Sequence, residues 1–291
     1  MYPSRFGYEA PSSIEEAIAL LSASGGEAKV LAGGQSLIPL LKLRFATPET
    51  IIDINKIPGL DFLTFEADGS IRVGALCRHA TLERSTELET AQPVMAAVAP
   101  LVADPIVRNR GTLVGSLCHA DPQGDWASVM MALGGSVVAQ GPSGRRSILV
   151  SDLVSGPFET VLAPDEIAVE AFVPAPTGVP MGGYLKLERR VGDFATVAAA
   201  VSVDMDGDKV VRAGIGMTAV GPTTLSASEA AAVLVGGPLS ESVIAEAADL
   251  AAAAATPRSD HRGSADYKKH ILRTFVIRLL NKVATSTQKV A

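Results

Sequence analysis

Cysteine is scarce in this sequence, and the two that occur, Cys77 and Cys118, lie far apart. Two distant cysteines exclude a disulfide framework and give no zinc-site spacing. An iron–sulfur cluster normally takes four cysteine ligands, so this chain alone cannot build one. The four histidines also lack metal-ligand spacing with cysteines or acidic residues. We therefore predict no metal site in this chain.

Long apolar runs are also missing. No stretch of about 18 apolar residues occurs, which excludes a transmembrane helix of ordinary length. The first residues, Met1 to Arg5, lack the basic start and apolar centre of a signal peptide. The net charge of −6 and the pI near 5.3 argue against a nucleic-acid groove, which needs a concentrated basic face. These absences predict an acidic cytoplasmic protein without a membrane span.

Motifs of hydrolytic enzymes are absent as well. The sequence contains no nucleophile elbow, no metalloprotease helix and no paired-carboxylate motif. We predict no catalytic side chain, and any chemistry must then come from a bound cofactor. Aromatic residues make up 4% of the chain and apolar residues 47%, much of it alanine, which favours helices packed through small side chains.

The length of 291 residues is enough for more than one compact unit, and turn-rich segments suggest three. The first unit, 1–57, has a helix capped by Ser13 and strands at 29–32 and 50–54. The second, 58–176, alternates strands and helices, with helices expected at 81–89, 91–103 and 127–133. The proline-rich segment 174–180 leads into the third unit, 177–291. There we expect three antiparallel strands followed by three helices, so the fold class is α+β.

The segment Val30–Leu37 contains the first candidate binding turn. A short apolar run ends in Gly33 and Gly34, polar residues follow, and a helical pattern begins after them. Glycine can take φ > 0 and lets a ligand lie against the backbone. Amide groups at the start of a helix favour phosphate oxygens. An ordinary strand–turn–helix connection is the alternative interpretation.

A second glycine turn lies in the middle unit, where Gly111 and Gly115 flank Thr112. The two turns could face each other across a cleft and clamp a pyrophosphate with their amides and hydroxyls. Asp125 could then accept from ribose hydroxyls, as acidic residues do in other dinucleotide sites. Two unrelated capped loops are the alternative. The Gly-x-Gly motif at 214–219 is no Rossmann site, because it lies within a strand pattern.

Several motifs, taken together, resemble those of one protein family. In this order and spacing they are similar to the FAD-binding medium subunits of the molybdenum hydroxylases, such as carbon monoxide dehydrogenase medium subunits and the flavin segment of xanthine dehydrogenases. The motifs are Ala32-Gly33-Gly34-Gln35-Ser36-Leu37, Arg108–Thr112 with Gly115-Ser116, Lys186-Leu187 with Arg190–Ala195, and Arg262–Lys268.

The resemblance implies a vanillyl-alcohol-oxidase type of FAD-binding fold, in which two α+β units hold an extended FAD and a third α+β domain covers the flavin. It places Asp125 at the ribose or adenosine end, and Leu162 and Lys186 at the isoalloxazine ring. It assigns the pyrophosphate to two runs of residues: Ala32, Gly33, Gly34, Gln35 and Ser36, and Thr112, Leu113, Val114, Gly115 and Ser116.

Three positions depart from the family pattern. Val114 stands where the family usually has the first glycine of a Gly-Gly pair, which puts close backbone approach there in question. Gln35 replaces the histidine of carbon monoxide dehydrogenase subunits, which favours a relative that hydroxylates an organic substrate such as an N-heterocycle, a purine or an aldehyde. Phe194 stands where related subunits often carry a tyrosine near the flavin, so the ring packing stays and the hydroxyl is lost.

The resemblance therefore implies the flavoprotein subunit of a heteromeric molybdenum hydroxylase. Its partners would be a small subunit with 2Fe–2S clusters and a large molybdopterin subunit, arranged as a dimer of heterotrimers. FAD would pass electrons from the clusters to an external acceptor. Two alternatives stay open: a subunit of the same fold that binds no FAD, and a stand-alone flavin oxidoreductase. The sequence gives neither the substrate nor the acceptor.

Overall fold

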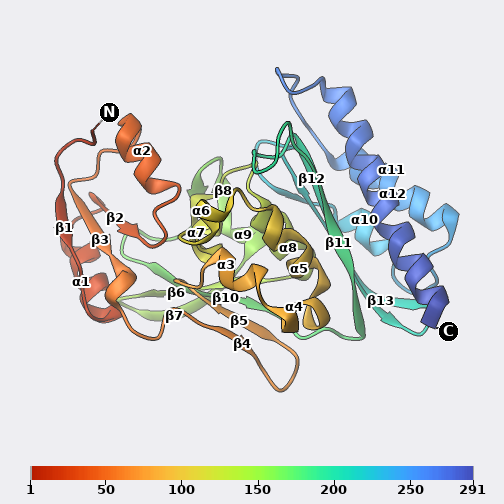
Figure 1. Ribbon diagram of the computed structural model, residues 1–291, viewed down its shortest axis with the longest axis horizontal. Coiled ribbons are helices and arrows are strands. Elements are labelled where there is room, and N and C mark those ends of the chain that lie inside the picture. Colours follow the sequence, from red (N-terminus) through yellow and green to blue (C-terminus); the bar gives the residue numbers. More distant parts are fainter. Residues whose placement is uncertain (1, 291) are drawn as a thin grey trace.

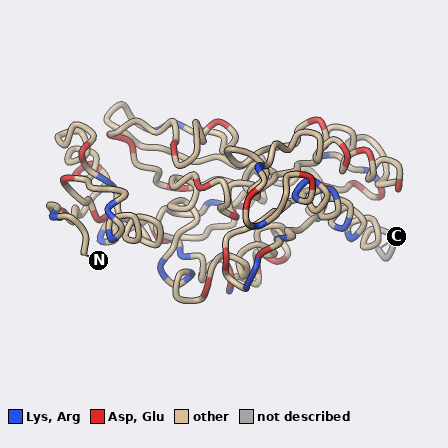
Figure 2. Tube along the Cα trace, turned by 90° about the horizontal axis from the view of Figure 1, so that it is seen from above, with Lys and Arg blue, Asp and Glu red and all other residues tan. Residues whose placement is uncertain are grey.

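The computed structural model describes the backbone of residues 2–290 and the side chains of residues 2–287. Its three α+β parts follow one another along the longest axis of the molecule, with the N-terminus near one end and the C-terminus at the other (Figure 1). Acidic and basic residues are interspersed along this whole length (Figure 2). No helix in the described chain combines the length and apolar character needed to span a bilayer.

The N-terminal part is a small parallel sheet in the order β1-β3-β2, with β1 at Gly7–Glu9, β2 at Ala28–Leu31 and β3 at Thr50–Asp53. Helix α1 (Ile14–Ala23) begins at the predicted cap, where the Ser13 hydroxyl accepts from the Glu16 amide at 3.1 Å. A second helix, α2 (Leu37–Leu43), and a 3-10 turn, η1 (Ile54–Lys56), complete this part. Strand β1 was not predicted, because its three exposed residues carry no apolar alternation.

The middle part is a five-stranded antiparallel sheet in the order β4-β5-β10-β6-β7. Its helices lie on one side of the sheet (Figure 1). The strands are β4 (Leu63–Phe65), β5 (Ile71–Gly74), β6 (Ser136–Gly141), β7 (Gly144–Leu149) and β10 (Ile167–Val173), with a small separate pair, β8 (Val154–Gly156) and β9 (Glu159–Thr160). The helices are α3 (His79–Glu83), α4 (Thr86–Ala91), α5 (Pro93–Val98), η2 (Ala99–Leu101), α6 (Pro105–Arg108), α7 (Leu113–His119), α8 (Asp125–Leu133) and α9 (Val150–Leu153).

Two helices expected in this part are broken, so their predicted extents are wrong. The helix expected at 81–89 is divided at Ser85, whose hydroxyl accepts from the Leu88 amide at 3.3 Å and starts α4. The helix expected at 91–103 starts at Pro93 and passes into the 3-10 turn that contains Pro100. Both changes follow from local chemistry, because a serine hydroxyl favours a cap and proline lacks a backbone donor.

The C-terminal part is an antiparallel sheet in the order β11-β12-β13-β14. The predicted strands are present, and a short fourth strand is added at the edge. Helices α5 and α8 of the middle part pack on one face, and the C-terminal helices cover the other (Figure 1). The elements are β11 (Val179–Leu187), β12 (Val197–Asp206), β13 (Lys209–Thr218), β14 (Leu225–Ser226), α10 (Ser228–Ala232), α11 (Glu241–Ala254) and α12 (Ala265–Val290).

The Gly-x-Gly motif of β13 lets this sheet approach the middle part. A Cβ atom at Gly214 would overlap the carbonyl oxygen of Ala132, and one at Gly216 would overlap that of Ser128, both on α8. Glycine is therefore required here for close packing of helix on sheet. Since helices cover both faces, β12 is buried over almost its whole length.

Candidate functional site

The two glycine turns meet in the structure. The first joins β2 to α2, and the second joins α6 to α7. A Cβ atom at Gly33 would overlap the carbonyl oxygen of Arg110 and would lie 2.8 Å from the Cα of Gly111. The two turns therefore face each other, as predicted, in direct backbone contact at this point, whereas the predicted cleft that clamps a pyrophosphate between them stays a prediction.

The two glycines of the first turn serve different purposes. Gly34 has φ = 75°, in the left-handed region, and a Cβ atom there would lie 2.8 Å from the Cδ1 of Ile38. Gly33 is not in that region, so the expectation of φ > 0 holds for Gly34 alone. Gly33 is needed because the opposite turn leaves no room for a side chain.

Backbone donors without a protein acceptor gather at this junction. In the described residues, no hydrogen bond is found for the backbone amides of Gln35, Ser36 and Leu37 in the first turn, nor for that of Val114 in the second. Each group precedes or opens a helix, and such amides favour anions. This donor set fits a diphosphate, which carries several acceptor oxygens and no donors.

Side chains of the two turns are mostly committed to the protein. Thr112 is buried and caps α7, since its hydroxyl accepts from the Gly115 amide at 3.1 Å. The side-chain amide of Gln35 donates through Nε2 to the Gly33 carbonyl at 3.2 Å. Val114 is 2% exposed and packs in the main core, so its side chain does not project over the turn. The departure at Val114 therefore leaves the backbone surface of the turn open.

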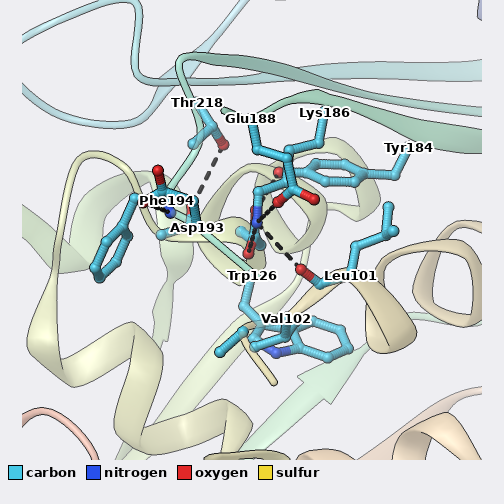
Figure 3. A network of polar contacts seen from close by, with 12 residues as sticks. Leu101, Val102, Trp126, Tyr184, Lys186, Glu188, Asp193, Phe194 and Thr218 are labelled. Carbon is cyan, nitrogen blue, oxygen red and sulfur yellow. Dashed lines mark hydrogen bonds and ion pairs between the residues drawn. The ribbon is translucent and has the colours of Figure 1, made fainter. Parts of the chain in front are cut away.

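Asp125 and Lys186 form an ion pair, and Figure 3 shows Lys186 beside Glu188, Tyr184 and Leu101. The Lys186 ammonium is 3.1 Å from Oδ2 of Asp125, 3.1 Å from the carbonyl oxygen of Leu101 and 3.4 Å from Oε2 of Glu188. The Tyr184 hydroxyl donates to Oδ1 of Asp125 at 2.7 Å. Because α8 packs on the sheet that contains β11, chiefly on β13 and β12, one acidic and one basic residue from distant segments form a buried pair.

This buried cluster holds two carboxylates around one ammonium. Burial raises the pKa of Asp125, although Lys186 and Tyr184 oppose that change by charge and hydrogen bonding. Burial and the Asp125 carboxylate together raise the pKa of Tyr184 well above its ordinary value, so it remains a neutral donor. Because Asp125 and Lys186 touch, they cannot lie at opposite ends of an extended FAD, as the resemblance implied.

The remaining predicted site residues lie farther along the chain. Leu162 follows β9, a strand that packs beside α7, and it is half-buried against the main core. Ser116 lies within α7, and Ala32 precedes the first glycine turn. Phe194 is exposed, and its carbonyl oxygen accepts from Arg262 at 2.6 Å, so the C-terminal segment holds the loop that carries Phe194.

Residues that the sequence did not single out lie behind the second turn. Arg78 donates to the Arg110 carbonyl at 2.7 Å, and the backbone amide of His79 donates to the Gly111 carbonyl at 3.0 Å. The buried Trp126 indole donates to Nδ1 of His79 at 3.0 Å. Burial, followed by the charges of Arg108 and Arg78, lowers the pKa of His79 to about 4. No motif marks these residues in the sequence.

A cavity of about 270 Å³ opens between the middle and C-terminal parts. It is lined by loops that lead into α8 and out of β13 and by the segment before α12. The lining residues are Pro122, Gln123, Pro157, Ala195, Thr196, Ala219, Gly221, Pro222, Arg258, Asp260, Arg262 and Lys268. Lys268 is paired with Asp260 at 2.7 Å, so the lining is partly neutralised.

Known families cover most of this chain. Residues 4–176 match the FAD binding domain in molybdopterin dehydrogenase, and residues 183–283 match the CO dehydrogenase flavoprotein C-terminal domain. The chain is 40% identical to the carbon monoxide dehydrogenase medium chain of Hydrogenophaga pseudoflava, over 97% of this chain and 98% of that relative. It is 37% identical to the nicotine 6-hydroxylase medium subunit of Paenarthrobacter nicotinovorans, over 96% and 98%.

Solved structures agree with this fold. The carbon monoxide dehydrogenase of Hydrogenophaga pseudoflava that lacks the Mo-pyranopterin moiety matches with a TM-score of 0.93 and 41% identity, over 99% of both chains. Quinoline 2-oxidoreductase from Pseudomonas putida 86 matches with a TM-score of 0.90 and 34% identity, also over 99% of both chains.

Proposed function

Because this chain belongs to the FAD-binding medium subunits of the molybdenum hydroxylases, we propose that its two glycine turns hold the diphosphate of FAD. The chain is an oxidoreductase subunit, and FAD is its cofactor. When bound, FAD takes up electrons and hands them to an acceptor. The chain itself supplies the binding surface and the electrostatic environment.

One observation carries the assignment of the site. The contact between Gly33 and the Arg110–Gly111 backbone brings the unpartnered amides of the first turn close to the second turn, where the Val114 amide is also unpartnered. The proposed binding residues are therefore those whose backbone forms this junction. Leu162 is proposed to line another part of the cofactor, and Asp125 and Lys186, which touch, are proposed to face it together at one place. The site residues are Ala32, Gly33, Gly34, Gln35, Ser36, Thr112, Leu113, Val114, Gly115 and Ser116.

The chain is the medium subunit of a heteromeric complex with a small and a large subunit. We propose that the complex is a cytoplasmic dimer of heterotrimers and that an external acceptor takes the electrons from this subunit. Relatives act on substrates as different as carbon monoxide and nicotine, and Gln35 favours an organic substrate for this complex. Two cysteines cannot ligate a cluster, so electrons reach the flavin from a partner subunit or from direct reaction with a substrate, and we propose the partner.

Valine substitutions test the diphosphate assignment. Gly34→Val places a branched side chain at φ = 75° against Ile38, whereas Gly59→Val imposes the same backbone strain at φ = 77° where nothing lies within 4 Å. We expect Gly34→Val to lose FAD and Gly59→Val to retain it, measured as flavin absorbance per folded chain. Equal flavin content in the two variants would refute the assignment.

Two alternatives predict different results. A subunit that binds no FAD would be colourless after purification, even when the parent sequence is expressed with excess flavin. A stand-alone flavin enzyme would purify without partner chains and would reduce its flavin with substrate directly. Purification of the complex from its natural source, with flavin and chain analysis, separates both from the proposed subunit.

A further inference from the structure

Arg78 and Asn55 form a side-chain bridge between the two glycine turns. The Arg78 guanidinium donates through Nη1 to the Arg110 carbonyl and through Nη2 to Oδ1 of Asn55, both at 2.7 Å. The Asn55 amide donates in turn to the Ala32 carbonyl at 2.8 Å. The bridge therefore connects a carbonyl of the second turn to a carbonyl of the first.

We propose that Arg78 and Asn55 are positioning residues that set the spacing and orientation of the two turns for a diphosphate. We call this pair the clasp. The inference rests on the proposed function, because it assigns to the clasp the geometry of that same site. The clasp side chains hold the turns in place and do not contact the diphosphate. The backbone amides of the turns bind it.

The anchoring of Asn55 suits a positioning role. Its backbone amide and its side-chain amide both donate to Oδ1 of Asp53, at 2.9 and 2.6 Å. The Tyr8 hydroxyl donates to the other oxygen of Asp53 at 2.6 Å. Burial alone would raise the pKa of Asp53, but the hydrogen bonds from Tyr8 and Asn55 bring it below the ordinary value, so the carboxylate stays ionised as an acceptor. Both hydrogens of the Asn55 amide are thus used, one for the anchor and one for the turn.

Arg78 is fixed to the second turn by its backbone as well. Arg78 and Thr112 form an isolated antiparallel bridge, and the following residue, His79, donates to the Gly111 carbonyl at 3.0 Å. From this fixed base the planar guanidinium reaches two acceptors at once, which a lysine ammonium on a flexible stem cannot reproduce with the same geometry.

The clasp also determines where amides point. A peptide unit is planar and trans, so its carbonyl and its N–H project to opposite sides. When Asn55 holds the Ala32 carbonyl, the Gly33 N–H of that peptide unit is directed away from the clasp. The carbonyl groups of the first turn thus accept hydrogen bonds from the protein, and its N–H groups stay available to an anion.

A double-mutant cycle tests whether the two residues act as one bridge. We would measure FAD binding to apoprotein by flavin fluorescence for Arg78→Met, Asn55→Ala and the double variant. Loss of a hydrogen bond to a charged group predicts a rise of about 10- to 100-fold in the dissociation constant for each single variant. Because either change opens the same bridge, the double variant should bind about as weakly as the single ones.

Conservative variants separate positioning from charge. Asn55→Asp keeps an acceptor for Arg78 but removes the donor to the Ala32 carbonyl, so it should bind FAD as weakly as Asn55→Ala. Arg78→Lys retains the charge and one donor, so it should recover part of the affinity lost in Arg78→Met. Thermal unfolding of each apoprotein reports folding separately, and these milder variants keep the test informative if Arg78→Met does not fold.

Matched controls lie elsewhere in the chain. Arg72→Met removes another arginine of the middle part that makes two bonds to one partner, Glu170, and Asn281→Ala removes an exposed asparagine of α12. Neither should change FAD affinity.

Three results would refute the proposed role of the clasp. They are fold losses of FAD affinity that multiply in the double variant, a loss of FAD affinity confined to the Arg78 variants, and FAD affinity equal to that of the parent in all variants. The second would mean that Arg78 meets the diphosphate directly by its charge. Gly34→Val, measured beside them, separates failure of the clasp proposal from failure of the proposed function. If it abolishes binding while the clasp variants bind normally, the clasp is wrong and the proposed function stands. If it also binds normally, the proposed function fails.

Discussion

Lys186→Met should destabilise the folded chain strongly, because it removes the ammonium that the buried Asp125 carboxylate and the partly buried Glu188 carboxylate face. The Lys186 side chain is 2% exposed and that of Asp125 is 8% exposed. Removing one partner of a buried pair typically costs about 3–5 kcal/mol, since the other charge stays buried without compensation. With a shift of roughly 2–4 °C per kcal/mol in chains of about this size, the melting temperature should fall by about 6–20 °C.

The second variant of this experiment identifies the cause. Asp125→Asn, added to Lys186→Met, removes the more deeply buried of the two orphaned charges and leaves an amide oxygen that can still accept from Tyr184. The double variant should therefore be more stable than Lys186→Met alone. Loss of packing by the lysine stem would instead lower both variants equally.

The pH dependence gives an independent test. Burial already raises the pKa of Asp125, and loss of Lys186 removes the main opposing charge and raises that pKa further. A carboxyl group with a raised folded pKa binds more protons in the folded state, so stability falls as pH rises above the unfolded value. The free energy of unfolding that Lys186→Met loses relative to the parent should thus be smaller at pH ~5 than at pH ~8.

Thermal and urea unfolding of the apoproteins at both pH values provides the measurement. The reasoning would be refuted if Lys186→Met and the double variant lost equal stability, or if the deficit of Lys186→Met were the same at both pH values. A fully reversible transition is needed for the free energies, and the order of melting temperatures is sufficient for the comparison.

Three further outcomes follow from the structure. The pKa of His79, about 4, lies below its unfolded value, so the parent should lose about 3 kcal/mol of stability as pH falls from ~6.5 to ~4, and His79→Gln should lack this loss in acid unfolding curves. Val114→Gly should leave FAD affinity unchanged in fluorescence titrations, because the valine side chain packs in the core, but it should cost about 2 kcal/mol or more in unfolding. Elemental analysis of the purified single chain should find neither iron nor molybdenum, and stoichiometric iron would contradict the division of cofactors among subunits.

The glycine turns could be predicted because their chemistry is local. Gly33, Gly34 and Gly111 follow or precede regular elements in patterns that constrain the backbone, and the structure brings these turns together. The reason for Gly33 was not visible in the sequence, since it depends on the opposing Arg110 carbonyl. A glycine that is required by a tertiary neighbour can be explained only when the tertiary structure is known.

The clasp and the buried pair could not be predicted for the same reason. Asn55 lies in a turn-rich stretch that indicated a boundary between units, and Arg78 belongs to no motif. Asp125 and Lys186 were each expected near the cofactor, but their contact depends on how α8 packs beside the sheet that contains β11. Side-chain pairs between distant segments follow from packing and register, and these leave no periodic signal.

The sheet formed by β11 to β14 has a consequence for how the protein is divided. One face is covered by α5 and α8 and the other by α10 to α12, and Gly214 and Gly216 lie against the backbone of α8. Cleavage between Pro174 and Pro180 would therefore expose an apolar surface on both fragments. The two family matches, 4–176 and 183–283, are separate domains at the level of sequence families. Neither is expected to fold alone as a soluble domain. A chimera that exchanges one module between relatives would have to carry the matching helix faces with it.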